Sequence, residues 1–80
     1  MERKTLLTHC SDAPGLISKI TNICYKHQLN IIHNNEYVDN ISGHFFMRTE
    51  LEGYFNDTTL LADLNQALPA HAKRKLIDSS

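Results

Sequence analysis

The sequence lacks the patterns that define several large classes of protein. Its 80 residues include no tryptophan, only two cysteines and no long apolar run. Two cysteines are too few for a disulfide scaffold and no Cys-x-x-Cys pair occurs, which favours a reducing, cytoplasmic location. The first residues lack the apolar core of a signal peptide. No segment is long enough to cross a membrane, so no membrane partner is expected.

An excess of basic residues is also missing. The net charge is −1, which argues against a nucleic-acid partner, because such binding depends on neutralising phosphates. The content of 41% hydrophobic and 21% charged residues is typical of a folded chain. This length predicts one small domain with a modest core, to which a second chain or domain could add stability.

Apolar periodicity predicts six elements in the order β-α-β-β-α-β, the ferredoxin-like arrangement of the α+β class. Strands are predicted at residues 4–10, 31–39, 44–52 and 73–78, and helices at 16–28 and around 60–68. In this fold two helices cover one face of a four-stranded antiparallel sheet, and the second strand lies at an edge.

Periodicity also assigns faces within these elements. Strict alternation predicts one inward-facing set in the third strand: Phe45, Met47, Thr49 and Leu51. Helical spacing predicts one buried stripe in the first helix: Leu16, Ile17, Ile20, Ile23, Cys24 and His27. Ser11 or Asp12 is expected to cap this helix, with Pro14 in its first turn, and Leu29–Asn30 is expected to end it.

The turn before the first helix, SDAPGLI, is the strongest candidate for a binding site. A helix N-terminus combines free N–H groups with a positive dipole end and can bind anions. Pro14 has no N–H, so the candidate donors are Gly15, Leu16 and Ile17. Asp12 would repel a simple phosphate, so a ligand of both charges, such as an amino acid, fits better. The alternative is that Gly15 only relieves packing against a neighbouring chain.

Other constellations have simpler interpretations. Cys24 and His27 have a spacing that could hold a metal, but Cys24 continues the apolar stripe, so core packing is favoured.

Asparagine is depleted in strands. Asn30 could cap the loop into the second strand, while Asn34 or Asn35 faces water.

The stretch GHFFMR loosely resembles the aromatic strand of RNA-binding domains that share this element order. Phe45 and Phe46 point to opposite faces, however. The solvent-exposed face of the sheet is expected to carry Glu36, Glu50 and Glu52 as well, so RNA binding is disfavoured.

The stretch DAPGLISKITNICYKHQLNIIHNNEYVD resembles the start of an ACT domain. The longer stretches ITNICYKHQLNI, GHFFMRTELEG and FNDTTLLADL closely resemble the N-terminal domain of the formyltetrahydrofolate deformylase family. The resemblance implies a small module that senses amino acids, with glycine or methionine as suggested effectors. It also implies the effector-binding residues, which are Asp12, Pro14, Gly15, Leu16, Ile17 and Asn30.

That family hydrolyses 10-formyltetrahydrofolate to formate and tetrahydrofolate for one-carbon and purine metabolism. Its chemistry belongs to a C-terminal domain that resembles formyltransferases. Residues 1–80 are therefore expected to form one regulatory domain excised from a longer enzyme. No catalytic residue, metal or cofactor is expected in it, and alone it should be inactive. The alternative is an assembly module that binds no effector.

The second strand, at residues 31–39, is expected to pair with its own copy across a two-fold axis. The first helices of the two chains would then lie side by side. In this homodimer Asn30 of one chain would meet the Gly15 turn of the other, forming two equivalent sites.

Overall fold

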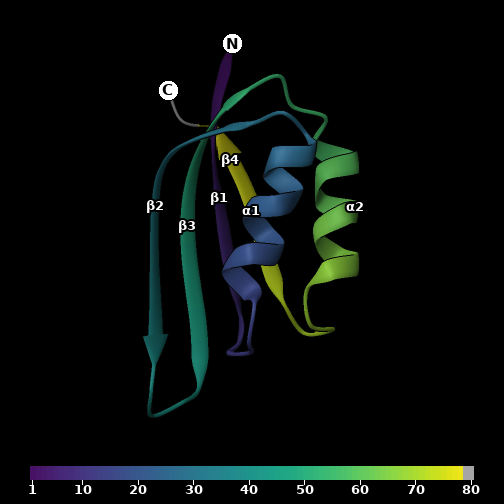
Figure 1. Ribbon diagram of the computed structural model, residues 1–80. Helices are drawn as coiled ribbons and strands as arrows, with labels where there is room; N and C mark the ends of the chain where they lie inside the picture. Colours follow the sequence, from purple (N-terminus) through teal and green to yellow (C-terminus); the bar gives the residue numbers. More distant parts are fainter. Residues whose placement is uncertain (79–80) are drawn as a thin grey trace.

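The computed structural model describes residues 1–78, which form a four-stranded antiparallel sheet with both helices on one face (Figure 1). The elements are β1 (Glu2–Ser11), α1 (Leu16–Lys26), β2 (Asn30–Asp39), β3 (His44–Gly53), α2 (Asp57–Ala67) and β4 (Lys73–Asp78). The strand order is β2-β3-β1-β4. The predicted fold is therefore confirmed, with β2 at one edge and β4 at the other.

β1 is one of the two central strands of the sheet, with β3 as the other. It pairs with β3 along its whole length, from Glu2 opposite Gly53 to Ser11 opposite His44, and with β4 on its other side. β2 also runs antiparallel to β3, so β1 and β2 point the same way. The turn that follows β1 and the residue that begins β2, Asn30, consequently lie at opposite ends of the sheet.

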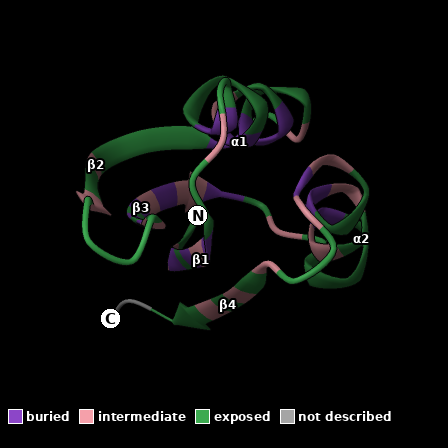
Figure 2. Cartoon of the chain, turned by 90° about the horizontal axis from the view of Figure 1, so that it is seen from below, coloured by how far each residue is buried: buried purple, intermediate pink, exposed green. Residues whose placement is uncertain are grey.

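The core lies between the sheet and the helices. In Figure 2 the buried residues gather on β1, β3 and the inner sides of the helices, whereas most of β2 is exposed. The predicted inward-facing set of β3 is buried, and Leu6, Ile20, Leu60 and Leu64 are fully enclosed. The predicted stripe on α1 is wrong at two positions. Ile17 is 40% exposed, and His27 follows the end of α1, where its Nε2 lies 2.7 Å from Oδ2 of Asp63 on α2.

Backbone geometry, rather than a side-chain cap, starts α1. Gly15 occupies the N-cap position with φ of 78°, in the left-handed region, and no side chain caps this helix in the described chain. The predicted cap from Ser11 or Asp12 is therefore wrong, because the chain reverses at Gly15 and places those residues before the cap position. A Cβ at Gly15 would meet nothing within 4 Å. Within the described chain, glycine is thus needed here for its φ and not for space.

The other helix ends differ in their chemistry. α1 ends at Lys26, earlier than predicted, because Gln28 adopts a positive φ of 59° and turns the chain toward β2. α2 has the side-chain cap that α1 lacks, since Asn56 Oδ1 accepts a hydrogen bond from the N–H of Thr59 at 3.2 Å. Lys4 on β1 lies 2.9 Å from the carboxylate of Asp57 and ties the sheet to the first turn of α2.

Replacing Gly15 by alanine should lower the free energy of unfolding by about 1 kcal/mol. A left-handed backbone costs a residue with a Cβ about 1–2 kcal/mol, and the stiffer unfolded chain offsets part of this cost. Gly15→Asn should lose less, because asparagine tolerates this region better. Urea denaturation would measure both variants. Equal denaturation midpoints for the wild type and Gly15→Ala would contradict the left-handed backbone conformation at Gly15.

Candidate functional site

A hollow of about 330 Å³ opens at the N-terminal end of α1. We call it the N-terminal hollow. Its lining comes from the β1–α1 loop, the first turn of α1, and β2 and β3: Asp12, Ala13, Gly15, Leu16, Ile17, Ser18, Glu36, Val38 and Phe45. Four of the predicted effector residues therefore gather in one place, and Pro14 lies between two of them in the chain.

The hollow combines hydrogen-bond donors with negative charge. The N–H of Lys19 donates to the carbonyl of Gly15, so the N–H groups of Leu16, Ile17 and Ser18 precede the first intrahelical bond. No acceptor for these three groups is found among the described residues. Asp12 and Glu36 are the charged residues of the lining, and both are acidic.

Glu36 is a site residue that sequence reasoning missed. It was expected on the solvent-exposed face of the sheet, which is wrong, because its pairing with the buried Met47 places it on the helix side. Asn34 holds its carboxylate through an Nδ2–Oε2 hydrogen bond of 2.9 Å. Asn34 in turn accepts a bond of 2.7 Å from the hydroxyl of buried Thr49. The register between β2 and β3 was the missing information.

A second hollow, of about 490 Å³, lies at the other end of α1. This C-terminal hollow is lined by Tyr25, Lys26, Gln28, Leu29 and Asn30. Asn30 is thus not brought to the Gly15 turn within one chain, since an 11-residue helix about 16 Å long separates the two hollows. The predicted site is divided into two halves.

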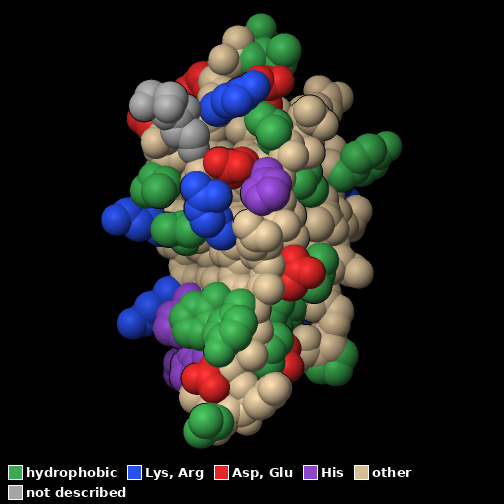
Figure 3. All heavy atoms as spheres, turned by 90° about the vertical axis from the view of Figure 1, so that its left-hand side faces the viewer, with side chains coloured by type: hydrophobic (Ala, Val, Ile, Leu, Met, Phe, Trp, Pro, Cys, Tyr) green, Lys and Arg blue, Asp and Glu red, His purple; other side chains and the backbone are tan. Residues whose placement is uncertain are grey.

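The unpaired edge of β2 runs between the two halves. Figure 3 views the molecule from this side and shows hydrophobic side chains gathered over part of it. Ile31, Ile32 and Ile17 are each more than a third exposed, and Tyr25 on α1 is 79% exposed. Several large apolar groups therefore lie in solvent beside backbone groups that lack a strand partner.

The cysteines belong to the core rather than to a metal site. Cys24 is fully buried, and burial raises the pKa of its thiol to about 11. Burial and the nearby Asp12 carboxylate also raise the pKa of Cys10. Within residues 1–78, no three histidine, cysteine or acidic side chains are grouped so as to hold a metal ion.

Comparison with known proteins agrees with this architecture. The sequence matches the model of the ACT domain family over residues 4–69. The chain belongs to the ACT domain family.

Relatives of this ACT domain are much longer proteins. The chain is 64% identical over 76 residues to formyltetrahydrofolate deformylase of Escherichia coli, covering 95% of itself and 27% of that protein. It is 65% identical over 77 residues to the Haemophilus influenzae enzyme of the same name, covering 96% of itself and 28% of the relative. The crystal structure of a formyltetrahydrofolate deformylase from Pseudomonas putida superimposes with a TM-score of 0.87 at 20% identity, over 98% of this chain and 29% of that one. The chain thus spans little more than a quarter of these proteins.

None of the helices described in this ACT domain is long and apolar enough to cross a membrane.

Both cysteines of this ACT domain should resist alkylation in the native state. The reactive species is the thiolate, and burial together with the raised pKa values keeps Cys10 and Cys24 protonated and shielded at neutral pH. Mass spectrometry after brief treatment with iodoacetamide should find no adduct without urea and two adducts with it. An adduct on one cysteine of the native chain would contradict the burial of that cysteine.

Proposed function

We propose that this chain is the amino-acid-sensing regulatory domain of a formyltetrahydrofolate deformylase. The identity with two enzymes of that name supports the parent activity, hydrolysis of a formylated tetrahydrofolate. Our proposal assigns no catalytic residue to this chain. Its contribution is to bind an effector and pass the signal to a catalytic region outside it.

One observation carries the proposal. The predicted effector residues lie in two hollows at opposite ends of α1, and the unpaired edge of β2 runs between them. If two copies pair antiparallel through β2 across a two-fold axis, the N-terminal hollow of one copy faces the C-terminal hollow of the other. The α1 helices then lie side by side, and the exposed Ile17, Ile31 and Ile32 become covered. Each dimer gains two equivalent composite sites.

The composite site has the charges that an amino acid requires. One copy supplies Asp12 and Glu36 for the ammonium group, together with the free N–H groups of α1 for the carboxylate. The partner copy supplies Lys26 and the amide of Asn30. Glycine and methionine are the effectors we would test first.

A cross-linking experiment tests the dimer. The double variant Ser18→Cys/Asn30→Cys cannot close a disulfide within one chain, because its sites lie at opposite ends of α1 and a disulfide needs Cα atoms within about 7 Å. Mild oxidation should give a covalent dimer on a non-reducing gel. Each single variant serves as a matched control and should remain uncross-linked. A monomer at micromolar concentration in light scattering, or equal cross-linking of the singles, would reject this assembly.

Calorimetry tests the sensing function. Titration with the twenty amino acids should give saturable binding of one or a few. Glu36→Gln should weaken that binding about tenfold or more, since a hydrogen bond to a charged group contributes about 1.5–3 kcal/mol. Glu52→Gln is the matched control, because its carboxylate contacts Arg3 on the opposite face. A cross-linkable dimer that gives no heat with any amino acid would identify an assembly module instead.

A further inference from the structure

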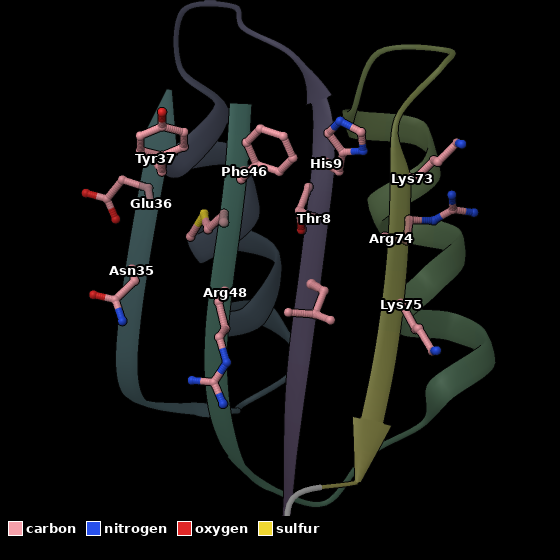
Figure 4. Close-up of a pocket in the computed structure, with 12 residues that line it drawn as sticks. Thr8, His9, Asn35, Glu36, Tyr37, Phe46, Arg48, Lys73, Arg74 and Lys75 are labelled. Atoms are coloured by element: carbon pink, nitrogen blue, oxygen red, sulfur yellow. The ribbon is translucent and has the colours of Figure 1, made fainter. Parts of the chain in front are cut away.

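The face of the sheet away from the helices carries a groove of about 450 Å³ that the effector proposal does not use (Figure 4). We call it the open-face groove. Its exposed side chains come from all four strands, and nothing in residues 1–78 covers it. Since this volume lies within the range of about 300–1,000 Å³ typical of small-molecule sites, a compact ligand could occupy it.

Aromatic rings form one end of the groove. Tyr37, Phe46 and His9 lie in a row across β2, β3 and β1 (Figure 4). His9 and Phe46 are stacked, with ring centroids 4.5 Å apart and planes 7° from parallel, and Tyr37 lies 6.2 Å from Phe46. Tyr37 is 65% exposed and Phe46 is 39% exposed. Because His9 covers one face of Phe46, the exposed ring of Tyr37 and the free side of Phe46 form an apolar platform against which a planar ring can pack.

Cations border this platform. Arg48, Lys73 and Lys75 line the groove, and neither lysine forms an ion pair within the described chain. Arg48 has one ion pair, at 3.5 Å from the half-buried carboxylate of Glu50. The region is locally basic although the whole chain has a net charge of −1.

Two of the three acidic residues that argued against an anionic ligand lie outside the groove. Glu50 and Glu52 occupy the same face but are not among the residues that line the groove. Glu36 borders it from the edge strand, yet its carboxylate is bonded to Asn34 on the helix side. The groove is therefore lined by more cationic than acidic side chains, and its one carboxylate lies at the edge strand.

We propose that the open-face groove binds a small planar aromatic anion of the nucleotide class. The ring packs against Tyr37 and the free side of Phe46, and its phosphate is held by Lys73 and Lys75. A purely apolar partner would leave both ammonium groups uncompensated, so charge complementarity favours the anion. This site lies on the opposite face of the sheet from the effector hollows and does not depend on them.

Titration with three probes tests whether both the ring and the charge are needed. Adenosine monophosphate should bind the full chain at least about tenfold more tightly than either adenosine or ribose phosphate, because each of these lacks one of the two recognised groups. Its binding should weaken as sodium chloride rises from about 50 to about 300 mM, because the ionic contacts are screened. Equal binding of adenosine monophosphate and ribose phosphate would overturn the proposal.

Two variants and their matched controls locate the site. Lys73→Gln/Lys75→Gln should weaken binding at least about fivefold, whereas Arg3→Gln/Lys19→Gln, at two positions outside the groove and both hollows, changes the net charge equally and should have no effect. Phe46→Leu should likewise weaken binding at least about fivefold, whereas Tyr54→Leu, an exposed ring outside the groove, should not. Thermal unfolding followed by circular dichroism confirms that each variant is folded.

Three results would reject the groove as a nucleotide site. The first is equal loss in the charge variant and its control. The second is binding that survives Phe46→Leu unchanged. The third is a strong preference for a ten-nucleotide oligoadenylate over the mononucleotide, which would assign the face to single-stranded RNA.

Discussion

The fold depends first on the pairing of β1 with β3, because every other element is placed by it. The ten-residue register aligns the inward-facing side chains of both strands, so that they form one apolar surface under the helices. β2 pairs with the other side of β3, and β4 pairs with the other side of β1. A shift by one residue would exchange the faces of the strand concerned, exposing Leu6 or Phe45 and burying charged side chains in their place. The separation between the helix side and the open face follows from this register.

The sequence was most informative where its pattern repeats. Strict alternation in β3 and the helical spacing of Ile20, Ile23 and Cys24 identified the elements and most of the core, since burial on one side imposes a period that is visible without a structure. Element ends were less certain. The left-handed conformations at Gly15 and Gln28 set both limits of α1, and composition could not distinguish a glycine needed for its backbone angle from one needed for close approach.

The candidate site was predicted only in part for a related reason. The turn at Gly15 is a local feature, and local sequence revealed it. The position of Glu36 depends on which β3 residue it pairs with, and the grouping of Tyr37, Phe46 and His9 depends on three strands coming together. Contacts of this kind join residues far apart in the chain. A strand with polar residues on both faces, such as β2, gives no alternation from which to infer the faces.

The two edges of the sheet differ in a way that limits its growth. β2 presents ten residues with little charge, whereas β4 is six residues long and begins with three successive basic side chains, Lys73, Arg74 and Lys75. Charged, short edges resist the addition of another strand. A sheet with two receptive edges could add copies without limit and form a fibre, but one with a single receptive edge is complete after one addition. If two copies pair through β2, the basic strand at each far edge would resist further addition, and the assembly would be closed at two chains.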